Sequence, residues 1–280
     1  MRIKATYWSI QELGKRSNQE DCIYPSLGVS LPDNDLFILC DGMGGHDCGE
    51  VASQTVCNTM STYLNSHPDA TFESALAAAY DALDAKDNHA GKKMGTTLAL
   101  LKLEEGQCIV AHIGDSRVYQ IRPSEKRIVY VTKDHSLVNE LVDCGELTLE
   151  EAKYSSQKNI ITRAMQPHQE RRSKADVAIL TDVKEGDYFF MCSDGMLEVT
   201  EDQDIVNILS LKKSDSQKVK ILKAVTNENN DNHSAHLIRI TSCVSRKVSA
   251  NMMRQSSKST LFVMALITVA VLGLIWYLVH

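Results

Sequence analysis

The sequence predicts an α+β fold in which sheets and helices form layers. Short segments with strand character recur along residues 1–241, and hairpin-like connections such as 104–106 and 114–116 join several of them. Two pairs of helical patterns interrupt these strands. Helices in pairs between runs of antiparallel strands indicate a layered α+β fold, whereas a parallel sheet would need helices alternating with single strands.

The N-terminal half contains the clearest individual elements. Residues 1–8 are typical of an edge strand, and residues 36–40 (LFILC) are a continuous apolar segment typical of a buried strand. Helical patterns follow at about 49–64 and 72–86, and Thr71 with Ser74 favours an N-terminal cap on the second. Three consecutive strands are then expected, at 95–103, 108–113 and 117–121.

The C-terminal half begins with residues 135–166, which are more polar, helical in part and without a strong core pattern. Strands are expected at 177–180, 188–192 and 235–240, with helices at about 203–209 and 217–228 between the last two. We therefore predict one domain over 1–241. The chain has 280 residues, 43% of them hydrophobic, which is enough for one large core or two smaller ones.

The last residues differ in composition. Residues 261–279 (LFVMALITVAVLGLIWYLV) carry no charge and are long enough to cross the ~30 Å hydrocarbon core of a bilayer. The Ser-rich, basic residues 242–260 read as a flexible linker. A buried core helix is the alternative for 261–279. With basic residues upstream, we expect a single-pass, tail-anchored membrane protein whose catalytic domain is cytoplasmic.

Charge and cysteine content exclude two classes of function. The formal net charge is -6, which gives the chain no general attraction for nucleic acid. The 8 cysteines form no Cys-x-x-Cys pair, so we expect reduced, mostly buried thiols and no zinc site.

Acidic residues in short clusters indicate the chemistry. Each cluster follows a predicted strand or stands in a tight glycine turn, and Mg²⁺ and Mn²⁺ prefer such oxygen ligands. The candidate metal ligands are Glu20, Asp21, Asp41, Asp115, Asp194 and Asp231.

Eight motifs that include these residues occur in the order found in one enzyme family. They are Arg16–Asp21 (RSNQED), 41–46 (DGMGGH), 95–97 (GTT), 114–117 (GDSR), 133–136 (KDHS), 161–163 (ITR), 193–195 (SDG) and 231–232 (DN). In this order they resemble the metal-dependent protein phosphatases of the PP2C type, the PPM family, over most of residues 10–240. Any one of them alone would be a weak signal.

The resemblance implies a four-layer α-β-β-α sandwich with two central, mostly antiparallel sheets. It also implies hydrolysis of phosphoserine and phosphothreonine in proteins, with an opposing Ser/Thr kinase as a partner. Two Mn²⁺ or Mg²⁺ ions about 3.5–4 Å apart would neutralise the phosphate and lower the pKa of a bridging water. That water would attack phosphorus in line, without a covalent enzyme intermediate.

The family pattern implies a role for each acidic residue. Asp41 would bridge both ions, with the Gly42 carbonyl as an added ligand. Asp194 and Asp231 would complete the shell of one ion. Glu20 would bind the other, with Asp21 supporting it from behind. Asp115 would help Asp194 to hold a third, looser ion, although its Gly-Asp-Ser-Arg turn could also be purely structural.

Two further residues complete the predicted site. Arg16 offers a planar pair of donors that fits two phosphate oxygens, and a surface salt bridge is its alternative. Asn232 is expected to orient Asp231. Thr96 and Thr97 read as strand residues behind the site, and residues 134–136 as a cap on the helix that follows.

The chain departs from the family pattern at a few positions. Met43 replaces a histidine that acts as a general acid in many eukaryotic members, so a metal-bound water would protonate the leaving group. Residues 135–166 resemble the flap beside the active site of bacterial members.

A catalytically silent, membrane-tethered phosphoprotein-binding domain is the alternative function. The presence of Glu20, Asp41, Asp194 and Asp231, together with Arg16, favours the enzyme, because silent relatives usually lose metal carboxylates. A membrane-localised scaffold is less favoured still, because the apolar segment has no Gly-x-x-x-Gly motif.

Overall fold

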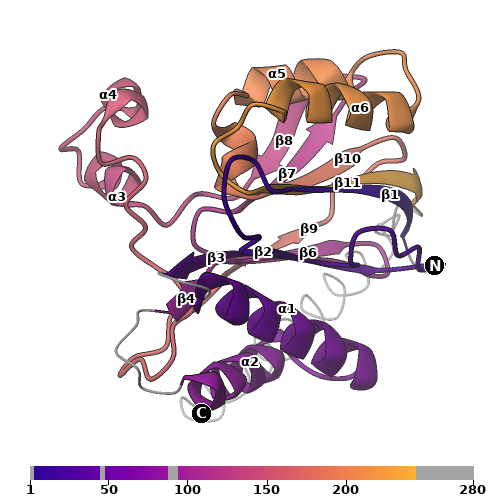
Figure 1. Cartoon of the computed structure of the whole chain (residues 1–280). Coiled ribbons are helices and arrows are strands. Elements are labelled where there is room, and N and C mark those ends of the chain that lie inside the picture. Colours follow the sequence, from indigo (N-terminus) through magenta and orange to yellow (C-terminus); the bar gives the residue numbers. More distant parts are fainter. Residues whose placement is uncertain (1–2, 45–47, 88–93, 244–280) are drawn as a thin grey trace, which may run out of the picture. The chain divides into compact units, whose positions relative to one another are not determined.

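Two antiparallel sheets pack face to face between two pairs of helices (Figure 1). The structure is a computed structural model that describes residues 3–44, 48–87 and 94–243. The predicted fold class, an α+β sandwich with two mostly antiparallel sheets, is confirmed. The linker and the membrane helix expected at 242–260 and 261–279 lie almost wholly outside the described residues.

The two sheets draw their strands from both halves of the chain. One sheet has the order β1 (Lys4–Glu12), β11 (His233–Ser242), β10 (Tyr188–Cys192), β7 (Arg117–Arg122) and β8 (Arg127–Val131). The other has the order β2 (Asp21–Tyr24), β3 (Leu36–Gly44), β5 (Leu98–Leu103), β6 (Cys108–Ile113) and β9 (Asp176–Leu180), and β4 (Met94–Thr96) pairs with β3. Strands β1 and β11 thus join the two ends of the domain.

Strand β3 shows how the layers form. Its side chains alternate between two faces, as in any strand. Leu36, Ile38 and Cys40 pack in the cluster that α1 and α2 cover. Phe37 and Leu39 pack against the opposite sheet. Because both faces are buried there, residues 36–40 of the strand are apolar at every position, which explains the continuous apolar segment in the sequence.

Helices cover the outer faces of the sandwich. Helices α1 (Cys48–Ser66) and α2 (Phe72–Lys86) lie on one sheet, and α5 (Asp202–Leu209) and α6 (Asp215–Thr226) on the other (Figure 1). Helices α3 (Leu137–Asp143) and α4 (Leu149–Tyr154) lie apart from both pairs, within residues 135–166. We call residues 135–166 the flap.

Most predicted elements are present, and the differences have local causes. Thr71 caps α2 as expected, by accepting from the backbone N–H of Ser74. The strand expected at 95–103 is interrupted at Thr97, which turns its backbone towards Asp41. Ser136 is the N-cap residue of α3, as expected from residues 134–136, but its side chain makes no capping hydrogen bond.

The predicted localisation is corrected. Within residues 3–44, 48–87 and 94–243, none of the helices combines the length and the apolar character that crossing a bilayer requires. The longest of them, α1, has 19 residues but exposes polar side chains on the face away from the sheet. The single-pass, tail-anchored assignment is therefore withdrawn.

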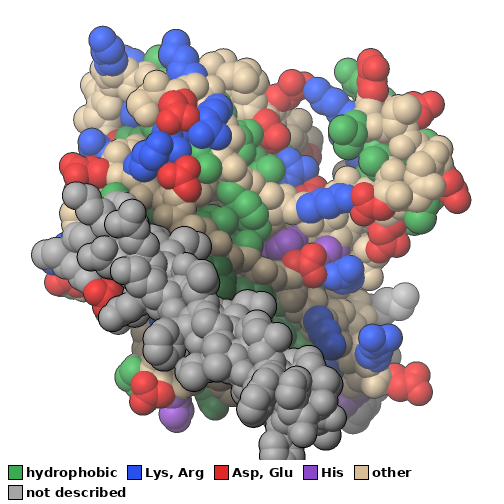
Figure 2. Space-filling view, turned by 180° about the vertical axis from the view of Figure 1, so that it is seen from behind, with side chains coloured by type: hydrophobic (Ala, Val, Ile, Leu, Met, Phe, Trp, Pro, Cys, Tyr) green, Lys and Arg blue, Asp and Glu red, His purple; other side chains and the backbone are tan. Residues whose placement is uncertain are grey.

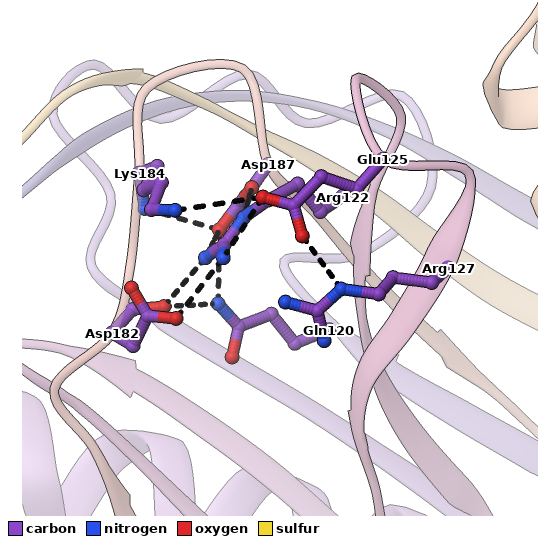
Figure 3. Close-up of polar contacts among 7 residues, drawn as sticks. All are labelled: Gln120, Arg122, Glu125, Arg127, Asp182, Lys184 and Asp187. Carbon is purple, nitrogen blue, oxygen red and sulfur yellow. Dashed lines mark hydrogen bonds and ion pairs between the residues drawn. The ribbon is translucent and has the colours of Figure 1, made fainter.

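A buried ion pair ties together the sheet end formed by β7 and the loop before β10 (Figure 3). Both Arg122 and Asp187 are 1% exposed. The Arg122 guanidinium donates to both carboxylate oxygens of Asp187, each at 2.9 Å, and Gln120 donates to one of them as well. Asp182 and Glu125 are further acidic partners of Arg122.

We predict that Asp187→Ala lowers the free energy of unfolding by about 3–5 kcal/mol, because it leaves the Arg122 charge buried without its main partner. Urea unfolding measures this loss. The matched control is Asp33→Asn, which removes the charge from the exposed pair of Lys4 and Asp33 and should cost about 0–1 kcal/mol. Equal losses in the two variants would contradict the account.

Candidate metal centre

Strand ends bring the six predicted acidic residues to one place. Asp21 begins β2 and stands opposite Asp41 of β3 in the register. Asp115 follows β6, Asp194 follows β10, and Asp231 precedes β11. The charge of Asp41 interacts with those of Asp21, Asp115 and Asp194, and Asp194 interacts with Asp231.

Burial and mutual repulsion act on these carboxyl groups together. Burial, followed by the charges of Asp21, Asp194 and Asp115, raises the pKa of Asp41 well above its ordinary value. Burial and the charge of Asp231 raise the pKa of Asp194. Burial raises the pKa of Asp21 to about 7, and it raises the pKa of Asp115 to about 7 as well. The charge of Asp194 adds to both shifts. Burial and mutual repulsion therefore both favour the neutral forms of these four carboxyl groups.

Two orphaned oxygens show that a cation fits this cluster. The Oδ1 atoms of Asp21 and Asp115 are buried and have no hydrogen-bond partner among the described residues. A buried carboxylate oxygen without a partner is costly, and a hard divalent ion is the partner that such oxygens prefer. The donor set therefore suits Mn²⁺ or Mg²⁺.

Close backbone packing at two glycines brings Glu20 and Asp41 together. A Cβ on Gly42 would lie 2.2 Å from the Gly49 carbonyl oxygen, and a Cβ on Gly49 would lie 2.6 Å from Oε2 of Glu20. Only glycine allows these approaches. Gly42 was a predicted site residue, whereas Gly49 could be recognised only from its contact with Glu20.

Asn232 links the loop that carries Glu20 to the start of β11. Its backbone N–H donates to Oδ1 of Asp231 at 2.8 Å, consistent with the role predicted for it. Its side-chain oxygen also accepts from the backbone N–H of Glu20 at 2.8 Å. Asn18, which the sequence reasoning missed, donates to Oε1 of Glu20 at 3.0 Å.

Asp21 is held by a residue from the opposite sheet. Ser193 is fully buried, and its hydroxyl donates to Oδ2 of Asp21 at 2.9 Å. The backbone N–H of Ser234 donates to the same hydroxyl at 3.0 Å, which orients it. The sequence reasoning missed Ser193 as a site residue. Its position next to Asp194 was the only available signal.

Two buried threonines hold the backbone of Asp41. The Thr97 hydroxyl accepts from the Asp41 N–H, and the Thr97 N–H donates to the Asp41 carbonyl, both at 2.9 Å. The Thr96 hydroxyl donates to the same carbonyl at 2.9 Å. Both threonines thus lie behind the site, as predicted.

Arg16 lies against the acidic cluster. Its guanidinium donates to Oδ2 of Asp231 at 2.7 Å, and its side chain is 57% exposed. The salt bridge considered as the alternative is therefore present, but its partner is one of the predicted metal ligands. The hydrogen bond and charge of Asp231 raise the pKa of Arg16, with Glu20 and Asp194 adding to the shift, so the group stays charged beside the site.

A sequence model of the protein phosphatase 2C family matches residues 15–242. The chain belongs to this family. It is 36% identical over 204 residues to the protein phosphatase PhpP of Streptococcus pneumoniae serotype 2, covering 70% of this chain and 80% of that protein. It is 33% identical over 202 residues to the serine/threonine protein phosphatase PstP of Mycobacterium tuberculosis, covering 70% of this chain and 37% of that protein.

Solved structures of phosphatases share the fold. The M. tuberculosis serine/threonine phosphatase PstP/Ppp matches with a TM-score of 0.72 and 27% identity, over 86% of this chain and 100% of that chain. The catalytic domain of PstP in complex with 2 manganese ions matches with a TM-score of 0.71 and 27% identity, over the same shares of the two chains. The predicted enzyme class, a protein phosphatase, is confirmed.

The hydrogen bond between Ser193 and Asp21 leads to a prediction about metal binding. Because its hydroxyl fixes Asp21, Ser193→Ala should weaken Mn²⁺ binding about tenfold, the usual cost of losing a partner behind a metal site. Calorimetric titration with Mn²⁺ measures this change. Ser216→Ala, on the exposed face of α6, is the control and should leave the affinity unaltered. Identical affinities in both variants would contradict the role of Ser193.

Proposed function

We propose that this chain hydrolyses phosphoserine and phosphothreonine in proteins, with two Mn²⁺ or Mg²⁺ ions in the acidic cluster. The observation that carries the proposal is the convergence of six acidic residues, two of which leave a buried oxygen unpaired. The complex of the PstP catalytic domain with 2 manganese ions supports the same number here. Family membership favours the enzyme over a silent phosphoprotein-binding domain.

The proposed ligand roles follow the family pattern. Asp41 would serve both ions, and the Gly42 carbonyl would add an oxygen. Asp194 and Asp231 would hold one of the ions, and Glu20 would hold the other. This assignment is supported by the bonds that fix the Asp41 backbone and the Glu20 side chain from neighbouring elements.

Two aspartates take supporting roles in the proposal. Asp21, bonded through one oxygen to Ser193, stands behind Glu20. Asp115, with its unpaired oxygen, joins Asp194 to hold a third, looser ion. Asn232 holds the Asp231 carboxylate and the Glu20 backbone in place through hydrogen bonds to both.

The bound ions would supply positive charge for the phosphate dianion and activate a water for in-line attack. The protein's own contribution is position and charge. Arg16 binds two phosphate oxygens through its planar guanidinium, and its exposure leaves it accessible to a substrate. No side chain becomes covalently bound to phosphorus in this mechanism.

Substrates and partners follow from this activity. Phosphorylated proteins are the substrates, and a Ser/Thr kinase that acts on the same proteins is the expected opposing partner. We place the catalytic domain at residues 1–241, a range that includes all of the described helices and strands except the final residue of β11, Ser242.

The full-length chain should turn over p-nitrophenyl phosphate and a phosphothreonine peptide only with added Mn²⁺ or Mg²⁺. A chelator should abolish turnover, and Asp194→Ala should lower kcat/KM at least ~100-fold, because a metal contributes several kcal/mol to the transition state. Asp33→Asn, at an exposed surface pair, is the control and should retain activity. Turnover that needs no metal and survives Asp194→Ala would refute the proposal.

A further inference from the structure

The two ends of the flap meet in a short antiparallel pairing. Ser136 bridges Ile161. The Leu137 N–H donates to the Ile160 carbonyl at 2.9 Å, and the Thr162 N–H donates to the His135 carbonyl at 2.8 Å. The segment between them carries α3 and α4 away from the sandwich (Figure 1). We call this pairing the root of the flap. It includes His135 and is one route by which movement of the flap reaches the sandwich, beside the ion pair of Lys153 in α4 with Glu201.

On its other side, His135 holds the turn that carries Asp115. The His135 N–H donates to the Gly114 carbonyl at 2.9 Å, and the Gly114 N–H donates to Nδ1 of the His135 ring at 3.1 Å. Gly114 has a φ of +103° and packs so tightly on Thr97 that a Cβ would lie 2.6 Å away. Both backbone polar groups of the residue before Asp115 thus depend on His135.

The second ring nitrogen of His135 faces the end of the flap. Because Nδ1 accepts the Gly114 N–H, the proton of the neutral ring is on Nε2. Nε2 lies 3.3 Å from Oδ2 of Asp176, and Arg163 donates to Oδ1 of the same carboxylate at 3.0 Å. Asp176 therefore links the His135 ring to Arg163. Arg163 lies two residues after Ile161, which pairs with Ser136 at the root of the flap.

His112 fixes the plane of the His135 ring. The two rings stack with centroids 4.6 Å apart and planes 14° apart, and His112 is 3% exposed. Nε2 of His112 lies 2.8 Å from the Lys133 carbonyl, which holds that ring in turn. Histidine side chains lie beside acidic and basic ones near the base of the flap (Figure 2).

A second metal site is the competing explanation for this group. His112, His135 and Asp176 each offer a ligand atom, all within 4.8 Å of one another. The hydrogen bonds argue against it, because Nε2 of His135 keeps its proton while Nδ1 accepts from Gly114. The Arg163 guanidinium also lies 3.3 Å from Nε2 and already supplies a positive charge to Asp176.

We infer that His135 is a positioning residue that couples the flap to Asp115. Nδ1 fixes the position of the Gly114–Asp115 turn by accepting the Gly114 N–H. Nε2 fixes the position of the flap's root through Asp176 and Arg163. A phosphoprotein that displaces the flap thereby alters the site at Asp115. This inference rests on the proposed assignment of Asp115 as a metal ligand.

Two substitutions separate the two functions of the ring. His135→Asn keeps an acceptor near the position of Nδ1 but loses the contact with Asp176. His135→Gln keeps a donor near the position of Nε2 but loses the bond from Gly114. Full-length variants are compared by calorimetric Mn²⁺ titration, by KM for a phosphothreonine peptide and by hydrogen exchange at the Gly114 amide.

His135→Gln should weaken binding of the most loosely held Mn²⁺ about tenfold and speed exchange of the Gly114 amide. His135→Asn should retain the Mn²⁺ affinity and instead raise KM for the peptide at least about fivefold, the lower range of coupling between sites. Asp176→Asn should behave as His135→Asn does. Asp33→Asn, an equivalent change at an exposed pair, should alter neither quantity.

The inference fails if the two His135 variants change Mn²⁺ affinity and KM by the same factor, as a purely structural role would cause, or if neither variant changes them. The inference would also be overturned if the wild-type chain binds Zn²⁺ and Asp176→Asn abolishes that binding, because a cation site would then explain the group.

Asp115→Asn tests separately whether Asp115 is a metal ligand. If that variant binds Mn²⁺ as the wild type does, the role of Asp115 is wrong. If it weakens binding while the His135 variants show no split, only the coupling is wrong.

Discussion

Repulsion among carboxylates crowded at one end of two packed sheets is the constraint on which the rest of this structure depends. Asp21 and Asp41 come from two strands of one sheet, and Asp194 follows β10 of the other sheet, yet their charges act on one another. Burial alone would favour their neutral forms. Strands packed over a continuous core hold the backbones in place, so the carboxylates cannot move apart to relieve the repulsion. Binding of divalent cations removes that cost.

Hydrogen bonds from neighbouring residues hold the acidic residues in place. Ser193 links Asp21 to the opposite sheet, and Thr97 ties the Asp41 backbone to the strand beside it. Asn232 joins the first loop to the last strand. These bonds connect residues as much as 212 positions apart in the chain, so the site exists only when both ends of the domain are paired. Stability and function therefore share the same contacts.

Sequence patterns were sufficient where one strong local signal was present. The buried strand β3 could be recognised because both of its faces are apolar, and α2 because its period and its Thr71 cap agree. Strands β2 and β8 were missed, since the first has four residues and the second is half exposed. The order of motifs identified the acidic residues, as Asp-Gly turns alone could not.

Contacts made only in the folded chain were beyond the reach of the sequence. Asn18 and Ser193 lie within recognised motifs, but their bonds to Glu20 and Asp21 are seen only in the folded chain, as is the close approach of Gly49 to Glu20. Ser136 is the N-cap residue of α3 as expected, whereas the bond from Gly114 to the neighbouring His135 ring had no signal in the sequence. The membrane assignment rested on composition alone and found no support in the helices that the structure describes.

Anomalous diffraction from crystals of the full-length chain grown with Mn²⁺ tests the central claim most directly. The account predicts two strong peaks in the acidic cluster, both within coordination distance of Asp41, one next to Asp194 and Asp231 and the other next to Glu20. Such peaks would show that the repelling carboxylates are metal ligands. Ordered crystals with no peak at Asp41, or with Mn²⁺ bound only elsewhere on the chain, would contradict it.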